Sequence, residues 1–234
     1  MSEPGRRSEL ELRLAEVQRR IAKACQAAGR DPGELTLIGV TKTRPASDVR
    51  LLSELGLRDV GENRDAEAAP KAAECADLDL TWHFIGQLQT NKCASVVRYA
   101  SVVHSVDRLR LIRALGKAAR DAGQVIEGLI EVSLDGDPAR GGAVADDVPA
   151  LAEALAVEEG LVLGGVMAVA PLDMEPTAAF AGLRDCATAV QAIRPAARVI
   201  SAGMSGDMEA AVEFGATHLR IGTALLGDRE PRVR

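Results

Sequence analysis

The chain has 234 residues, of which 47% are hydrophobic and 26% are charged, and its formal net charge is −6. This length and balance fit one globular domain with a full core. The acidic charge, without a dense block of lysine or arginine, argues against nucleic acid as a partner. The N-terminus is polar, and no apolar run approaches the roughly 20 residues of a membrane span, so no membrane association is expected.

The cysteines are widely spaced, with no pairing typical of zinc or redox sites. They are Cys25, Cys75, Cys93 and Cys186. This pattern predicts buried thiols in a reducing, cytoplasmic environment. Because no exposed apolar stripe stands out, we expect a monomer.

An amphipathic helix is predicted over residues 8–28, where Leu10, Leu14 and Ile21 recur at helical spacing and Gly29 follows as a stop. Short apolar runs then alternate with helical patterns. The predicted strands lie near 35–41, 58–61, 82–86, 101–105, 126–134, 161–168, 197–202 and 217–221. The predicted helices between them lie near 46–55, 65–76, 91–98, 107–122, 146–159, 176–193 and 206–214.

Eight strands joined by helices, with no long linker, favour a closed barrel over an open sheet. We therefore predict an α/β fold, a single (β/α)8 TIM barrel, over residues 1–234. The helix 8–28 is extra to the barrel repeat and is expected to cover a flank, and residues 229–234 form a polar tail. The short strand at 58–61 is the weakest element of this prediction.

Lys42 follows directly on the first apolar run, which is typical of a parallel strand buried on both faces. The carboxyl ends of barrel strands are where such folds bind ligands. A lysine amine held there can be desolvated, lose its proton and attack a carbonyl as a Schiff-base nucleophile. The alternative is an ordinary solvated loop lysine.

Two further segments have the composition of a phosphate site, which barrels commonly build after strands seven and eight. After strand seven, Gly203 and Gly206 permit close backbone approach to an anion, and Ser205 offers a hydroxyl. After strand eight, Gly222 and Thr223 can supply a second N–H and hydroxyl. The alternative for both segments is an ordinary glycine-containing turn.

In a closed barrel, the lysine and the phosphate loops face each other across the mouth. One molecule satisfies both: pyridoxal 5′-phosphate, with an aldehyde at one end and a phosphate at the other. Arg220, at the end of strand eight, is placed to meet the pyridine nitrogen. Guanidinium has only donors and keeps its proton, so a nitrogen facing it stays unprotonated and the ring is a poorer electron sink. The alternative for Arg220 is a surface ion pair.

Several segments resemble the pyridoxal phosphate homeostasis protein family, over about residues 8–228. They are Thr41-Lys42-Thr43-Arg44-Pro45, Gly61-Glu62-Asn63, the run from Trp82 to Lys92, Gly203-Met204-Ser205 and Arg220-Ile221-Gly222-Thr223. That family is similar in fold to the N-terminal barrel of alanine racemase.

The resemblance implies an internal aldimine on Lys42 and a pyridine contact from Arg220. It implies phosphate contacts from four residues: Ser205, Gly206, Gly222 and Thr223. It also implies that Met204 lies against the cofactor and that Asn63 lies near it.

The chain departs from the family pattern at three positions. Arg64 stands where tyrosine is frequent, and Arg44 and Arg140 stand where lysines are usual. Arginine keeps the charge but forms no imine, which puts a cofactor-relay role for these two positions in doubt. His83 is open between a cofactor-facing role and that of a satisfied core histidine.

Three functions fit these residues. The first, implied by the resemblance, is a carrier that buffers pyridoxal phosphate and supplies it to other proteins, with PLP-dependent apoenzymes as candidate recipients. The second is a PLP-dependent amino-acid racemase, but racemisation needs a second acid–base group, and the one tyrosine, Tyr99, is predicted to lie far from the mouth. The third is a Schiff-base aldolase acting on a sugar phosphate. We expect the carrier.

Overall fold

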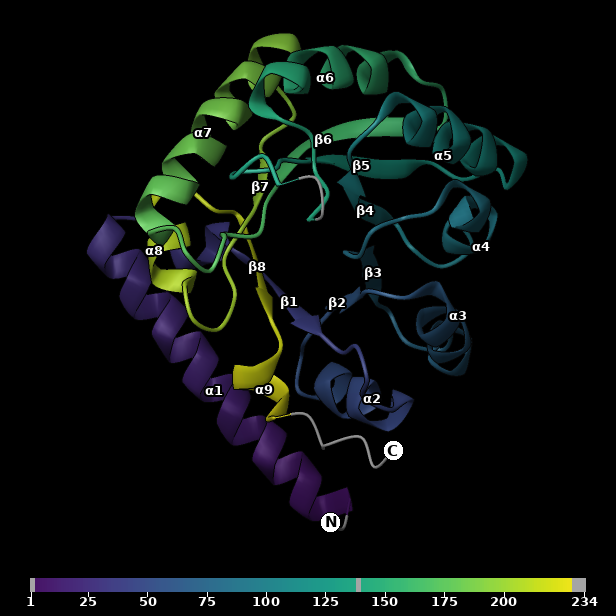
Figure 1. Ribbon diagram of the computed structural model, residues 1–234. Coiled ribbons are helices and arrows are strands. Elements are labelled where there is room, and N and C mark those ends of the chain that lie inside the picture. Colours follow the sequence, from purple (N-terminus) through teal and green to yellow (C-terminus); the bar gives the residue numbers. More distant parts are fainter. Residues whose placement is uncertain (1–2, 138–139, 229–234) are drawn as a thin grey trace.

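The computed structural model describes residues 3–137 and 140–228. Eight parallel strands form a closed barrel in the order β1 to β8, and helices surround it (Figure 1). The strands are β1 (Thr36–Val40), β2 (Asp59–Glu62), β3 (Thr81–Phe84), β4 (Val102–Val106), β5 (Ile126–Glu131), β6 (Leu161–Met167), β7 (Val199–Ser201) and β8 (His218–Ile221). The predicted TIM barrel is confirmed. The proposed tail at 229–234 lies outside the described residues.

The helices of the described chain follow the predicted order. They are α1 (Glu3–Ala28), α2 (Ala46–Glu54), α3 (Asp65–Glu74), α4 (Cys93–Val96), α5 (Leu109–Asp121), α6 (Val148–Val157), α7 (Pro176–Ile193), α8 (Met208–Glu213) and α9 (Thr223–Leu226), with 3-10 turns at Pro32–Glu34, Thr90–Lys92 and Ala145–Asp147. Helix α1 begins five residues earlier than predicted, and the predicted helix 91–98 is divided between a 3-10 turn and the shorter α4. The short helix α9 was not predicted.

Barrel closure depends on the pairing of β1 with β8, 182 residues later in the chain. Ile38 is in register with Arg220, and β1 also pairs with β2 through Val40 and Gly61. A Cβ on Gly222, just after β8, would lie 3.6 Å from Cβ of Val40. The end of the last strand is therefore beside the end of the first, and the two predicted halves of the site meet at one mouth.

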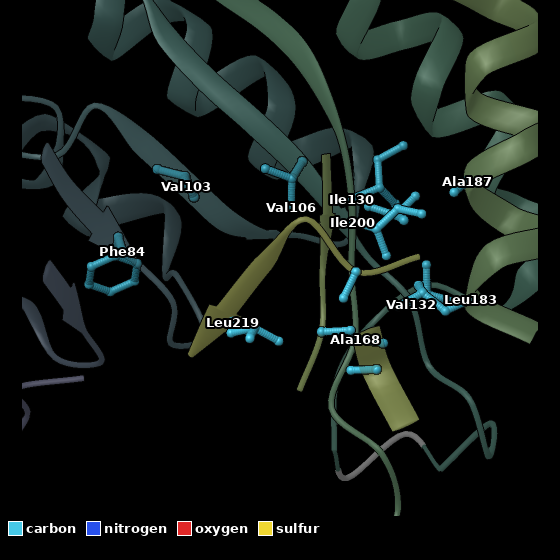
Figure 2. Close-up of a cluster of buried hydrophobic side chains, with 14 of the residues drawn as sticks. Phe84, Val103, Val106, Ile130, Val132, Ala168, Leu183, Ala187, Ile200 and Leu219 are labelled. Carbon is cyan, nitrogen blue, oxygen red and sulfur yellow. The ribbon is translucent and has the colours of Figure 1, made fainter. Parts of the chain in front are cut away.

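The main core lies between the strands and the helices. Figure 2 shows outward-facing strand side chains such as Phe84 and Ile200 in a cluster with Leu183 and Ala187 of α7, and all four are buried. On β1, a Cβ at Gly39 would lie 2.5 Å from Cδ2 of Leu57, so a larger residue there would displace the Leu57 side chain. This layer is apolar, as expected for strands covered by helices.

Helix α1 lies beside α8 and α9 and covers that flank of the barrel (Figure 1). Its own Leu10 and Leu14 side chains are buried. At its N-terminal half, Arg6 donates two hydrogen bonds, of 3.0 and 2.6 Å, to the buried carboxylate of Asp48 in α2. The predicted apolar stripe is thus the packing face of α1.

No helix within the described residues combines the length and apolar composition needed to cross a bilayer. All four cysteines are buried and none forms a disulfide in the described structure.

Candidate functional site

Lys42 lies just beyond β1, at the carboxyl-terminal mouth, and its side chain is half-buried. A Cβ on Gly61 would meet Ile38 at 3.0 Å and Val40 at 3.5 Å, which places all three on the inner face of the barrel. Because side chains alternate along a strand, Lys42 continues the face of Ile38 and Val40. The structure therefore places Lys42 where the sequence predicted.

A buried ion pair supports the backbone that carries Lys42. The Nζ of Lys71 in α3 donates to Oε1 of Glu62 at 2.5 Å and to the carbonyl oxygen of Thr41 at 2.8 Å. The Thr41 hydroxyl donates to the same Oε1 at 2.6 Å. Thr43, which follows Lys42, has a φ of 66°, which is unfavourable for a β-branched side chain. The loop is therefore held in one defined conformation.

The loop after β7 has the geometry of an anion site. Gly203 has a φ of 91°, and a Cβ there would lie 2.7 Å from Ala211, so glycine is required. Within the described residues, the amide N–H groups of Ser205 and Gly206 donate to no protein acceptor. A Cβ on Gly206 would meet nothing within 4 Å, so space is open beside these donors.

The loops after β7 and β8 are joined directly. The N–H of Ala224 donates to the Ser205 hydroxyl oxygen at 3.1 Å. Gly222 and Thr223 lie at the start of α9, between that contact and the end of β1. The predicted phosphate residues thus form one continuous rim next to the strand that leads to Lys42, rather than facing that lysine across the mouth as expected from the sequence.

Arg220 is buried, with 4% of its surface exposed. Its Nη1 donates to the Ser201 hydroxyl at 2.6 Å, and its Nη2 donates to the carbonyl of Ala168 at 2.7 Å. Burial lowers the pKa of Arg220 to about 10, which still leaves the guanidinium charged at neutral pH. The alternative of a surface ion pair is wrong for this residue.

Glu131, at the end of β5, adds an unpredicted acid to the mouth. Its Oε2 is buried and has no hydrogen-bond partner in the described structure. Burial, and to a smaller extent Asp107, raise the pKa of Glu131 to about 7 against the opposing effect of Arg220. A carboxyl group that is partly protonated at neutral pH therefore lies close enough to Arg220 for the two groups to interact electrostatically. No motif in the sequence identified it.

The histidines lie inside the barrel. His83 bonds through Nε2 to Asp59 at 2.9 Å and through Nδ1 to His104 at 2.9 Å. His104 in turn bonds through Nδ1 to the Ser201 hydroxyl at 3.0 Å. His83 is therefore a satisfied interior histidine, and it is also connected, through His104 and Ser201, to Arg220. Sequence reasoning missed His104, Ser201 and Asp59.

Asn63 and Met204 lie on the rim. Asn63 follows β2 and is half-buried, and the loop after β3 passes so close that a Cβ on Gly86 would lie 2.2 Å from the Asn63 carbonyl. Met204 is 37% exposed, and its N–H donates to the Asp207 carboxylate at 2.6 Å. Their predicted positions against and near the cofactor stay predictions.

Two of the arginines that depart from the family pattern form hydrogen bonds with loops of the rim. Arg44 donates to the carbonyls of Gly227 and Asp228 at 2.7 and 2.6 Å. Arg140 pairs with Asp135 at 3.3 Å and donates to the carbonyl of Val169 at 3.2 Å. Arg64 is exposed and precedes α3.

These features of the described chain define the class of protein: a (β/α)8 barrel with a lysine, a buried arginine and a loop with unpaired amide donors at one mouth. A family model described as alanine racemase, N-terminal domain, matches residues 12–230. Alanine racemase from Corynebacterium glutamicum shares the fold, with a TM-score of 0.66 at 15% identity over 94% of this chain and 64% of that one.

The more similar proteins narrow this class. A pyridoxal phosphate homeostasis protein of Mycobacterium tuberculosis is 43% identical over 98% of this chain and 96% of its own length. The protein of that name in Escherichia coli is 35% identical over 93% and 95%. PipY of Synechococcus elongatus, solved with PLP bound, has a TM-score of 0.82 at 34% identity, covering 93% of this chain and all of that one. The chain belongs to the pyridoxal phosphate homeostasis protein family.

Proposed function

We propose that this chain binds pyridoxal phosphate as a Schiff base on Lys42 and carries and buffers the cofactor within the cell. The names of its relatives and the PLP-bound structure of PipY support cofactor binding and a homeostatic role. The observation that carries the assignment is that Lys42, Arg220 and the loop after β7 lie at one barrel mouth.

The phosphate end of the cofactor fits the loop after β7. The unpaired amide donors of Ser205 and Gly206 match the acceptor oxygens of a phosphate, and the space beside Gly206 is open. Ser205 is itself held by the Ala224 N–H, so its hydroxyl hydrogen remains available to a ligand. Gly222 and Thr223 complete this rim.

The nitrogen end fits Arg220. Nη1 and Nη2 each donate one hydrogen bond, to Ser201 and to Ala168. Nε donates to no described residue, and it is not one of the fully buried atoms that lack a partner. A guanidinium has five N–H donors, so Nε–H and the second N–H of each Nη are left for an acceptor in the mouth. A ring nitrogen in this position accepts and stays unprotonated, which restrains carbanion chemistry and suits storage better than turnover.

The amine of Lys42 supplies the covalent attachment. When bound, pyridoxal phosphate presents an aldehyde, and the Lys42 nitrogen forms a C=N bond with it as one water is released. Addition of water reverses the step and restores both the amine and the aldehyde. The Lys71–Glu62 pair fixes the Thr41 carbonyl and so holds the start of this loop in place.

A racemase is disfavoured by the position of Tyr99. This side chain packs edge-on against Trp82, with ring centroids 6.4 Å apart, in the layer outside the barrel. Its phenol pKa is raised by burial and by Asp65. It therefore cannot supply the acid–base group that a racemase needs on the second face of its substrate.

Borohydride trapping tests the attachment. The protein loaded with PLP is reduced, digested and mapped by mass spectrometry. We expect the reduced adduct on the peptide containing Lys42, and loss of both adduct and visible absorption in Lys42→Ala. Lys92→Ala, which removes an exposed lysine from the five in the chain, is the control and keeps both. An adduct on another lysine in the unaltered protein would overturn the assignment.

Two assays separate a carrier from an enzyme. Incubation with L-alanine and other L-amino acids, followed by chiral analysis, should show no sustained turnover, and mixing the loaded protein with a PLP-dependent apoenzyme should restore that enzyme's activity. Racemisation at ordinary enzyme rates would contradict the carrier proposal. Monomeric state and cytoplasmic location remain predictions, to be checked by light scattering and cell fractionation.

A further inference from the structure

A chain of four hydrogen bonds crosses the barrel interior from the mouth toward its opposite end. Arg220 bonds to Ser201 at 2.6 Å, Ser201 to His104 at 3.0 Å, His104 to His83 at 2.9 Å and His83 to Asp59 at 2.9 Å. These residues come from β8, β7, β4, β3 and β2. We call this set the interior relay.

The chemistry of the two ends gives the interior relay a direction. Arg220 can only donate, and an ionised Asp59 can only accept. If each group donates one proton onward, Ser201 donates to Nδ1 of His104. His104 then donates from Nε2 to Nδ1 of His83, and His83 donates from Nε2 to the carboxylate. Both histidines are then neutral and protonated on Nε2.

The reverse direction has a defined obstacle. If His104 carried its proton on Nδ1, it would accept from Nδ1 of His83. Nε2 of a neutral His83 would then be a second acceptor facing the Asp59 carboxylate, so the reversal requires an additional proton on that pair. Burial, together with His83 and Arg220, lowers the pKa of His104 well below its ordinary value, which favours the neutral ring.

We infer that Ser201, His104, His83 and Asp59 are positioning residues, which hold the Arg220 guanidinium in one orientation toward the ring nitrogen of the cofactor. This rests on the proposed function. In the described structure no carboxylate lies within 4 Å of Arg220, and both of its bound acceptors are uncharged oxygens. The arginine therefore keeps its full positive charge for the ligand, while Asp59, at the other end of the relay, supplies a distant negative charge.

The far end of the interior relay is open to solvent. The Asp59 side chain is 25% exposed and lines a cavity of about 400 Å³, together with Leu14, Ile21, Thr36 and Arg58. Thr36 begins β1, so this cavity is at the amino-terminal end of the barrel, opposite the mouth. Asp59 is therefore reached by solvent from the side of the barrel opposite the mouth.

Other titratable and charged groups lie near the interior relay without belonging to it. His218 of β8 has its ring centroid 6.3 Å from that of His83, yet it bonds to Thr217 at 2.9 Å and stands outside the relay. Glu127 and Glu131 face inward from β5, and Asp207 acts on Arg220 from the mouth. His218→Gln is therefore a matched control, because it removes an interior histidine without breaking the relay.

The first experiment uses the protein without cofactor. With only three histidines in the chain, selective 15N labelling and NMR resolve every ring. At neutral pH we expect His83 and His104 to be neutral Nε2–H tautomers. Ser201→Ala should alter the Nδ1 signal of His104, whereas His218→Gln should leave the tautomers of both rings unchanged. A His104 ring with its proton on Nδ1, or one charged at neutral pH, would overturn the proposed direction.

The second experiment tests the effect on the ligand. Ser201→Ala should hold pyridoxal phosphate roughly tenfold more weakly and change the pH profile of its visible spectrum, because Arg220 loses a hydrogen bond that fixes it. Ser201→Thr, which keeps the hydroxyl, should restore both the affinity and the pH profile. Asp59→Asn, the variant to use if Ser201→Ala fails to fold, should give a smaller change in the same direction. Unchanged affinity and pH profile in folded Ser201→Ala and Asp59→Asn would refute the positioning role. Failure of the unaltered protein to form the adduct would instead refute the proposed function, without affecting the NMR result.

Discussion

The two faces of the barrel wall differ in chemistry. The outer face, under the helices, is apolar and closely packed, with Phe84 and Ile200 among its strand residues and Leu183 of α7 among the side chains of the covering helices (Figure 2). The inner face carries Arg220 and His104, both buried and both hydrogen-bonded. Alternation along each strand makes this separation possible, because neighbouring residues face opposite sides. Substitutions on the outer face should therefore affect stability, and those on the inner face should affect the ligand.

The largest effect on stability is expected from the outer face. Phe84 is 2% exposed, so Phe84→Ala should lower the free energy of unfolding by about 3–5 kcal/mol. Urea denaturation of the protein without cofactor measures this loss. The visible spectrum of the loaded variant should match that of the unaltered protein while it remains folded, and a changed spectrum would show that the two faces are not independent.

The Lys71–Glu62 pair lies outside the barrel but supports Lys42, so it crosses the division between the faces. Lys71→Met leaves the fully buried Glu62 carboxylate without its cation and should cost about 3 kcal/mol in unfolding free energy. Because the Thr41 carbonyl also loses its partner, the rate of Schiff-base formation should fall. Lys71→Met with Glu62→Leu should recover much of the stability without restoring that rate. Recovery of both would contradict a supporting role for the pair.

Glu131 gives the inner face a pH dependence. Its pKa is raised in the folded state from 4.5 to about 7, so the folded protein binds its proton more tightly and loses stability as the pH rises through 7. Between pH 4.5 and pH 8 the loss should approach about 3 kcal/mol, and Glu131→Gln should remove it. The unfolding free energy is measured by urea denaturation at several pH values. The same change with pH in the variant and in the unaltered protein would exclude the effect.

His218 gives a smaller dependence of opposite sign. Burial lowers its pKa from 6.5 to about 4, so the unfolded chain binds the proton first and stability falls as the pH drops below 6.5. At pH 5.5 this contribution should be about 1 kcal/mol, and it should be absent in His218→Gln. Thermal unfolding of both proteins at pH 7 and 5.5 tests it. An equal loss in both would assign the acid sensitivity to other groups, such as His104.

The sequence predicted the barrel and half of its mouth because those signals are local. The run before Lys42 is a short apolar strand, and the loop from Gly203 to Gly206 begins with a glycine that its backbone requires. Resemblance then added Asn63 and Met204. The interior relay could not be predicted in this way, because its partners are far apart in sequence: His104 and Ser201 are 97 residues apart. Periodicity gives the face on which a residue lies but not its neighbour across the barrel, and the register shift between Val103 and Val106 disturbs even that pattern.

The central claim is that Lys42 and the loop after β7 hold opposite ends of one molecule. A crystal structure of the protein loaded with pyridoxal phosphate tests it most directly. We predict electron density continuous from Nζ of Lys42, with the phosphate on the amides of Ser205 and Gly206 and the ring nitrogen facing Arg220. A phosphate bound elsewhere, or a cofactor not joined to Lys42, would contradict the account.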